Sequence, residues 1–407
     1  MTQASAGPKS LRRKQIGVGG LTISARAKAL VMEVLDSGRL SAGPMMARFE
    51  SEIASIHGCR YGLMCNSGTS ALQISLAALK ERYGWQDGDE VLVPALTFVA
   101  TSNVVLYNGL TPVFVDVERE FFDIDPHKIE ERITPRTRAI IPVHIAGLPC
   151  DMTPILEIAQ RRNLRTIEDS CEAMFVNYEG RPVGSFSDVA CFSTYIAHIV
   201  TTGVGGLCTT NDPELLVCMK SLMNHGRDSI YIRCDDDQQA KESELFQIAN
   251  SRFSFIRFGH SFRCTEMEAA IGLAQIEDRQ TRMARRQEAA NRLTNGLTPF
   301  SNHLQLPRAR QGGEHGFMFY PLAIIDPAVQ RNDLVLFLEA RGIETRYLLP
   351  LISQPIYRKL FGNLDAQYPV AAWLNENAFY IGCHPEMSDD DIDYVIEQFK
   401  QYFGGRT

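Results

Sequence analysis

Short apolar runs rich in β-branched residues alternate with longer amphipathic segments through the first half of the chain. The strand-like runs lie at residues 61–65, 90–94, 112–116, 138–143, 165–167, 189–193 and 207–210. The segments with helical spacing between them lie at 71–82, 98–107, 126–131 and 152–161. This alternation is typical of an α/β fold, in which helices cover both faces of a mainly parallel sheet.

The remaining segments suggest how the chain divides. A helix at 24–37 precedes the first strand, and a long charged helix is predicted from Arg263 to about Leu297. A smaller α+β region follows, with strands at 317–325 and 343–347 and helices at 331–340 and 388–403. We therefore expect three parts, which are a flexible N-terminal arm over 1–22, a large domain over 23–297 and a small C-terminal domain over 298–407.

A polar turn follows the first predicted strand and carries candidate chemistry. The turn is Asn66-Ser67-Gly68-Thr69-Ser70, and a helix begins directly after it. The first backbone N–H groups of a helix are free and its dipole favours an anion, so the turn suits a phosphate group. An ordinary helix cap is the alternative interpretation. The turn has no GKS/T sequence, so a nucleotide triphosphate is not implied.

Composition and charge narrow the class of function. The net charge of −7, with 45% apolar and 22% charged residues, argues against nucleic acid or an anionic membrane as the main partner. The ten cysteines include no CxxC or CxC pair, which favours free thiols in a reducing cytoplasm over a metal or iron–sulfur site. No signal peptide and no membrane-spanning run is predicted. The acidic run from Asp235 to Glu244 is interpreted as a solvated insertion.

The stretch 191–206, CFSTYIAHIVTTGVGG, brings aromatic, hydroxyl and imidazole groups to the end of a predicted strand. It resembles the cofactor-lysine segment F-S-F-x-x-x-K-N-x-T-T-G-E-G-G of the DegT/DnrJ/EryC1/StrS sugar aminotransferases. Other motifs similar to that family occur in order along the chain: GRLSAGP, NSGTSAL, PALTFVATSN, VHIAG, IEDSCEA and EMEAAIGLAQI. The lysine position of the family segment holds His198.

The resemblance implies a pyridoxal-phosphate transferase of fold type I, similar to aspartate aminotransferase, with the large domain binding the cofactor. It implies a cytoplasmic homodimer whose active sites lie at the subunit interface. Carried over residue by residue, it implies these cofactor contacts: Ser67, Gly68, Thr69 and Ser193 at the phosphate, Phe98 stacked on the ring, Asp169 at the pyridinium nitrogen, Glu172 near the ring hydroxyl, and Ser261 at the partner's phosphate. The family usually has Gln at position 172 and often Asn at position 261.

The missing lysine changes the expected chemistry. No Lys occurs from 129 to 219, so the lysine Schiff base of an ordinary aminotransferase cannot form here. Imidazole can still transfer protons near neutral pH. The 3-dehydratases of nucleotide-linked 4-keto-6-deoxyhexoses form a subgroup of the family with His at this position, and they use pyridoxamine phosphate. The resemblance therefore implies that His198 acts as the base in removal of the C3 hydroxyl, with glutamate as amino donor.

Two alternatives stay open. One is an atypical aminotransferase acting on a nucleotide sugar or a related carbohydrate. The other is a catalytically degenerate partner subunit, although the phosphate turn, Phe98 and Asp169 argue against degeneration. Ile199 follows His198 where the dehydratases often have a second His. The candidate phosphate-binding cations are Lys14, Arg227, Arg263 and Arg346.

Overall fold

The computed structural model describes residues 15–228, 241–251 and 253–404. Its central element is a seven-stranded sheet with the strand order β1-β9-β8-β5-β4-β2-β3. The strands are β1 (Tyr61–Cys65), β2 (Glu90–Pro94), β3 (Thr111–Val115), β4 (Thr137–Ile140), β5 (Arg165–Asp169), β8 (Val189–Ser193) and β9 (Gly206–Thr210). The pairs from β8 through β5, β4 and β2 to β3 are parallel. Only β9 runs antiparallel to its neighbours, so the predicted mainly parallel sheet is confirmed.

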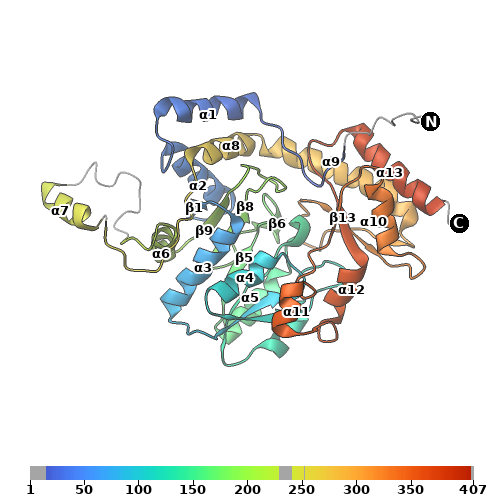
Figure 1. Cartoon of the computed structure of the whole chain (residues 1–407), viewed down its shortest axis with the longest axis horizontal. Helices are drawn as coiled ribbons and strands as arrows, with labels where there is room; N and C mark the ends of the chain where they lie inside the picture. Colours follow the sequence, from blue (N-terminus) through green and yellow to red (C-terminus); the bar gives the residue numbers. More distant parts are fainter. Residues whose placement is uncertain (1–14, 229–240, 252, 405–407) are drawn as a thin grey trace, which may run out of the picture.

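Helices cover this sheet (Figure 1). Those that contact its strands are α2 (Pro44–Ile56), α3 (Gly68–Tyr83), α4 (Val99–Tyr107), α5 (Met152–Arg162) and α6 (Pro213–Met223). Outside them, α8 (Glu266–Glu277) packs on α2, and α1 (Ala25–Ser37) packs on α8. The sequence explains their ends, because Ser24 caps the start of α1 and Gly38 closes it in the left-handed conformation. Figure 1 shows α1 and α8 running side by side.

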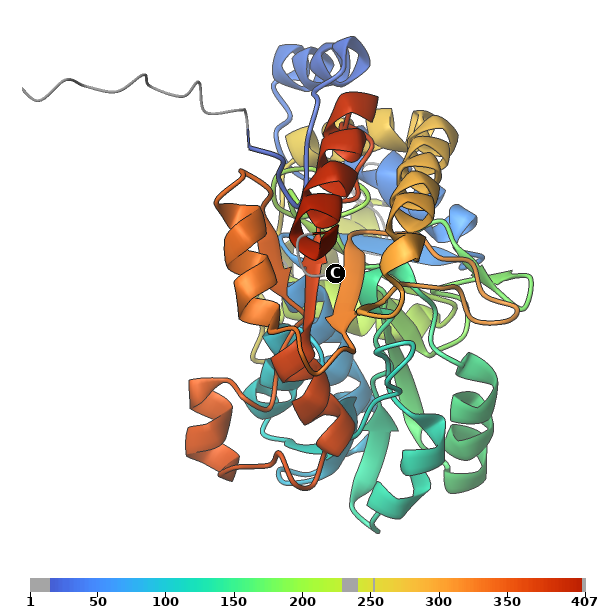
Figure 2. The same ribbon diagram turned by 90° about the vertical axis from the view of Figure 1, so that its right-hand side faces the viewer.

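A second sheet lies in the C-terminal part of the chain, with the strand order β10-β11-β13-β12. Its strands are β10 (Leu304–Gln305), β11 (Tyr320–Ile324), β12 (Thr345–Tyr347) and β13 (Ala378–Ile381). The helices of this part are α9 (Arg279–Leu297), α10 (Arg331–Glu339), α11 (Pro355–Phe361), α12 (Pro369–Asn377) and α13 (Asp389–Gly404). Figure 2 shows α13 packed beside α9. The two helices and the sheet share a hydrophobic core that is distinct from that of the larger sheet.

Three predicted elements differ from the structure. The helix expected at 126–131 is instead two short 3-10 helices, Pro126–Lys128 and Glu130–Arg132. The long helix expected from Arg263 is divided at Asp278, whose backbone leaves the helical conformation between α8 and α9. Within the expected flexible arm, residues 16–21 are buried or half-buried, and Ile16 is 7% exposed and pairs with Ile343.

The remaining segments add little to the site. Residues 235–240 of the acidic run lie outside the described residues, and α7 (Glu242–Ser251) follows them. A two-stranded sheet joins β6 (Asn177–Tyr178) to β7 (Arg181–Pro182). The cysteines within the described ranges form no disulfide with one another. Over those same ranges, every helix is too short or too polar to cross a lipid bilayer.

Candidate active site

The predicted site residues come from the carboxyl ends of neighbouring strands. Asp169 is the last residue of β5, and Ser193 is the last residue of β8, which pairs in parallel with β5. The turn after β1 reaches the same place, because Ser67 bridges to Gly205 while Gly206 pairs with Ser193. In open α/β sheets this edge is where ligands bind.

The turn at the start of α3 lies against Ser193. A Cβ atom at Gly68 would lie 2.8 Å from the Cβ of Ser193 and 2.8 Å from the Sγ of Cys171, so only glycine permits this approach. The hydroxyl of Ser67 accepts a hydrogen bond from the backbone N–H of Ser70 at 3.0 Å and caps the helix. Thr69 is exposed in the first turn. The helix is 16 residues long, and its free N–H groups, together with the hydroxyls of Ser67 and Thr69, can hold a phosphate.

Asp169 is buried, and no lysine or arginine among the described residues forms an ion pair with it. Its side chain is 4% exposed and accepts hydrogen bonds from Thr101 Oγ1 at 2.8 Å and from the Cys171 N–H at 3.2 Å. Burial raises the pKa of Asp169, against the opposing effect of these hydrogen bonds. Phe98 lies three residues before Thr101 at the start of α4 and is 56% exposed. Thr101, which donates a hydrogen bond to the buried Asp169, therefore lies in the same helix that begins at the exposed ring of Phe98.

Glu172 follows Asp169 in the chain and is also buried. Its Oε2 accepts a hydrogen bond of 2.7 Å from the backbone N–H of Ala146, a residue in the left-handed conformation. Burial raises the pKa of Glu172 to about 8, and the Ala146 hydrogen bond opposes this effect. Below that pH the carboxyl group is protonated, so it can donate a hydrogen bond as Gln does.

His198 lies in the turn that follows β8. Its backbone N–H donates to the carbonyl of Tyr195 at 2.9 Å, and the two rings meet edge to face at 6.1 Å. The Tyr195 side chain is 53% exposed, whereas His198 is half-buried and its Nδ1 has no hydrogen-bond partner among the described residues. Burial lowers the pKa of His198 to about 4, so the imidazole is neutral near pH 7.

The N-terminal segment covers this turn. A Cβ atom at Gly19 would lie 3.0 Å from the Cα of Ala197, the residue before His198. The segment is held in turn by the Val18 N–H, which donates to Glu344 Oε2 at 2.9 Å, and by the Gly17 carbonyl, which lies 3.2 Å from His384 Nε2. Residues 16–20 therefore connect the second sheet to the His198 turn.

Ser261 belongs to a separate polar group. It pairs with Asn224 and its hydroxyl accepts a hydrogen bond of 3.1 Å from Arg263. Arg263 and Arg227 line a pocket of about 1190 Å³ between α2 and α6. The neighbouring Phe262 carbonyl accepts a hydrogen bond from the Asn66 N–H at 2.8 Å, so this group lies beside the turn of α3 rather than at Asp169.

The residues brought together suit pyridoxal phosphate. Gly68 leaves room at an anion-binding helix end, Asp169 is a buried hydrogen-bond acceptor, and Phe98 presents an aromatic face. Sequence reasoning missed Thr101 and Cys171, which hold Asp169 by hydrogen bonds. The signal for Thr101 was its position one helical turn after Phe98.

Comparison with known proteins agrees with this geometry. A family model described as the DegT/DnrJ/EryC1/StrS aminotransferase family matches residues 22–400. GDP-perosamine synthase of Caulobacter vibrioides is 34% identical over 390 residues, which cover 95% of this chain and 98% of that protein. The dTDP-4-dehydro-2,6-dideoxy-D-glucose 3-dehydratase of Saccharopolyspora spinosa is 32% identical over 387 residues, which cover 92% of this chain and 83% of that protein.

Solved structures give the same result. The E. coli GDP-4-keto-6-deoxy-D-mannose-3-dehydratase with bound hydrated PLP matches with a TM-score of 0.83 and 25% identity, covering 95% of this chain and 100% of that chain. The fold class predicted from the sequence is therefore confirmed. The chain belongs to the DegT/DnrJ/EryC1/StrS aminotransferase family and is an enzyme that depends on pyridoxal phosphate.

Proposed function

We propose that this enzyme removes the C3 hydroxyl from a nucleotide-linked 4-keto-6-deoxyhexose, with pyridoxamine phosphate as the working form of the cofactor. The observation that carries the proposal is the neutral, half-buried imidazole of His198 where the family segment has lysine. Without a lysine, residue 198 cannot form a Schiff base with the cofactor, but its imidazole can still transfer a proton.

The substrate class is supported by two relatives. One is named as a synthase of GDP-perosamine and the other as a dehydratase of a dTDP-linked sugar. Both names describe sugars linked to nucleotides, so the chain is assigned to nucleotide-sugar chemistry. Arg227 and Arg263 are candidate contacts for the diphosphate, because both line the same pocket. Of the other candidate cations, Arg346 pairs with Glu344, and Lys14 lies outside the described residues.

Each site residue has one task in this proposal. When bound, pyridoxamine phosphate supplies an amine that condenses with a ketone and a ring that takes up an electron pair. The turn at Ser67, Gly68 and Thr69, together with Ser193, holds the phosphate group. Asp169 holds the ring nitrogen in its protonated form, and Phe98 stacks on the ring face.

His198 moves the proton. Its Nδ1 is buried, so we assign the proton transfer to Nε2. A low pKa keeps the imidazole neutral at pH 7, and with its hydrogen assigned to Nδ1 the lone pair of Nε2 can accept a proton. Protonated Glu172 donates a hydrogen bond where the family usually has Gln. We further propose that glutamate is the amino donor and that the enzyme is a homodimer in which Ser261 reaches the partner's site.

A second candidate is an atypical aminotransferase acting on a nucleotide sugar. The observation that supports it is the identity of 34% over 390 residues to a protein named GDP-perosamine synthase. This function would require an amine to be delivered to the sugar without an active-site lysine at position 198.

Borohydride reduction tests the proposal. The purified enzyme is loaded with pyridoxal phosphate, reduced, and digested for peptide mass measurement, beside a His198→Lys variant. The wild type should release all cofactor, whereas the variant should carry reduced cofactor on Lys at 198. Glutamate should convert bound aldehyde in the wild type to an amine form that absorbs near ~330 nm. A lysine adduct in the wild type would refute the assignment of His198 and favour the aminotransferase.

A further inference from the structure

Glu168, the residue before Asp169, is a fully buried carboxylate on the opposite face of β5. Successive side chains of a strand point to opposite faces, so Asp169 faces the candidate cofactor site while Glu168 faces the interior. The Glu168 side chain is 0% exposed. An acidic side chain is rarely buried to this extent without a structural or functional reason.

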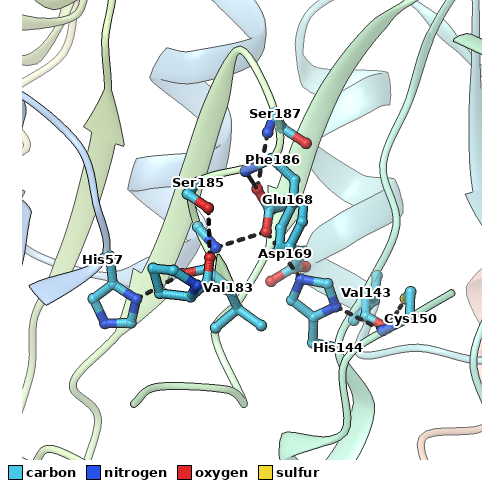
Figure 3. Close-up of polar contacts among 12 residues, drawn as sticks. His57, Val143, His144, Cys150, Glu168, Asp169, Val183, Ser185, Phe186 and Ser187 are labelled. Carbon is cyan, nitrogen blue, oxygen red and sulfur yellow. Dashed lines mark hydrogen bonds and ion pairs between the residues drawn. The ribbon is translucent and has the colours of Figure 1, made fainter. Parts of the chain in front are cut away.

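Three backbone donors and one imidazole surround this carboxylate (Figure 3). Its Oε1 accepts from the Gly184 N–H at 2.6 Å, and its Oε2 accepts from the N–H groups of Phe186 at 2.9 Å and Ser187 at 3.0 Å. The turn at 184–187 leads directly into β8, which carries Ser193. The hydrogen bonds of Glu168 therefore link the turn before β8 to the end of β5.

His144 completes the group and links it to Asp169. Its Nδ1 accepts a hydrogen bond of 3.0 Å from the Cys150 N–H, so the ring hydrogen lies on Nε2. That Nε2 donates to Glu168 Oε1 at 3.2 Å. The backbone N–H of His144 donates to the carbonyl of Asp169 at 3.1 Å. His144 thus contacts residue 168 through its side chain and residue 169 through its main chain.

We propose that Glu168 and His144 are positioning residues that hold the end of β5, and with it the carboxylate of Asp169, in the orientation needed to bind the ring nitrogen of the cofactor. The inference rests on the proposed cofactor role of Asp169, and it holds for a dehydratase or an aminotransferase alike. The pair acts through Asp169 and the start of β8, and it does not touch the cofactor. Residues that orient a charged group in this way strongly affect function even though they make no contact with the ligand.

Glu168→Gln is the main variant. It keeps the shape of the side chain but turns an amide NH₂ toward backbone N–H groups, which leaves buried donors unpaired. The matched control is Glu266→Gln. Glu266 is likewise buried, at 1% exposed, and accepts the N–H groups of Gly43, Met45 and Met46 at the start of α2. Its partners belong to α2 rather than to β5 or β8.

Three quantities are measured for each protein: the dissociation constant of pyridoxamine phosphate, the absorbance of bound cofactor across pH 5–9, and the melting temperature. Both Gln variants should lose thermal stability. Glu168→Gln alone should also weaken cofactor binding by about 10- to 100-fold and displace the pH dependence of the absorbance band. His144→Gln leaves the three backbone bonds of Glu168 in place and should show the same changes to a smaller degree. It keeps the test available if Glu168→Gln does not fold.

Wild-type cofactor affinity and spectrum in a folded Glu168→Gln or His144→Gln variant would overturn the proposal. Asp169→Asn is measured alongside to separate the two possible failures. If Asp169→Asn also leaves the spectrum unchanged, the cofactor role of Asp169 is wrong. If Asp169→Asn changes the spectrum and the Glu168 and His144 variants do not, only the positioning role fails.

Discussion

At the scale of the residue, burial controls the protonation of the candidate catalytic groups. It lowers the pKa of His198 to about 4 and raises that of Glu172 to about 8. Asp169 is shifted upward by burial as well. The site therefore holds a neutral base and a neutral acid near pH 7, with no ion pair between them among the described residues. This combination suits proton transfer on an uncharged sugar ring.

We predict that His198→Asn lowers kcat for water loss by about 10²- to 10⁴-fold, because the base is removed while the phosphate turn is untouched. In the wild type, the free-enzyme profile of kcat/KM should show no fall near pH 6.5, the ordinary pKa of histidine, since His198 remains unprotonated down to about pH 4. Steady-state rates across pH 5–8 check both points. A half-loss of kcat/KM at pH 6.5 that is absent from the variant would contradict the neutral base.

Glu172→Gln should change stability in a pH-dependent way. The unfolded carboxyl ionises near its ordinary value of 4.5, whereas the folded one keeps its proton to about pH 8. The wild type therefore loses stability as the pH rises from 4.5 to 8, and Gln, which never ionises, does not. Urea unfolding of cofactor-free protein should give an advantage to the variant that grows between pH 5 and pH 9. An advantage that is constant with pH would mean that Glu172 ionises normally.

At the scale of the element, the turn carrying His198 is held from above by residues 16–20. Gly19 allows this contact, because its Cβ would meet the Cα of Ala197 at 3.0 Å. The turn is thus positioned by a segment from the far end of the chain, and not only by β8.

Gly19→Ala should therefore lower kcat, with little change in cofactor affinity, because the added methyl group displaces the His198 turn but not the phosphate turn. We expect a loss on the order of 10-fold or more, since small misplacements of catalytic groups have large effects on rate. Gly404→Ala is the matched control, as a Cβ there meets nothing within 4 Å. Equal activities of the two variants would show that the contact does not position His198.

Some strands and helices could be predicted from the sequence and others could not. Strands β1, β2 and β8 match their predicted bounds, because each is a short apolar run bounded by turn residues. Helices α11 and α12 were not predicted from the sequence, although Pro355 and Pro369 stand at the first helical position, where proline is favoured.

Part of the candidate site could be predicted from the sequence for a similar reason, because it lies at strand ends. Asp169, Ser193 and the turn at Gly68 could be placed because strand ends follow from local pattern. The partners of Asp169 could not be placed, since Thr101, which donates to its carboxylate, and His144, whose N–H donates to its carbonyl, come from other segments of the chain. Only the assembled sheet brings such pairs together.

At the scale of the whole molecule, the segment 253–258 exposes three aromatic side chains to solvent. Phe253, Phe255 and Phe258 are exposed by 84%, 49% and 103%, close to the group that contains Ser261. Contiguous exposed apolar residues mark interaction surfaces. A second copy of the chain would cover them and bring Ser261 toward the partner's site, as the proposed homodimer requires.

We predict that Phe258→Asp shifts the enzyme from dimer to monomer and weakens cofactor binding with it. Leu336→Asp is the matched control, because Leu336 is 68% exposed on α10, which lies on the opposite side of the molecule from α6 and α7 in Figure 1. Light scattering at equal protein concentration reports the mass of each variant. A Phe258→Asp protein of wild-type mass would place the subunit interface elsewhere.

The proposed function depends on whether the enzyme removes the C3 hydroxyl of the sugar or adds an amine at C4. The most direct measurement is the product mass after incubation with pyridoxal phosphate, glutamate and a nucleotide-linked 4-keto-6-deoxyhexose. The proposed function predicts a product that has lost the C3 hydroxyl and carries a ketone at C4, formed about 10²- to 10⁴-fold more slowly by the His198→Asn variant. A product that carries a new amine at C4 and keeps the C3 hydroxyl would contradict it and identify the enzyme as an aminotransferase.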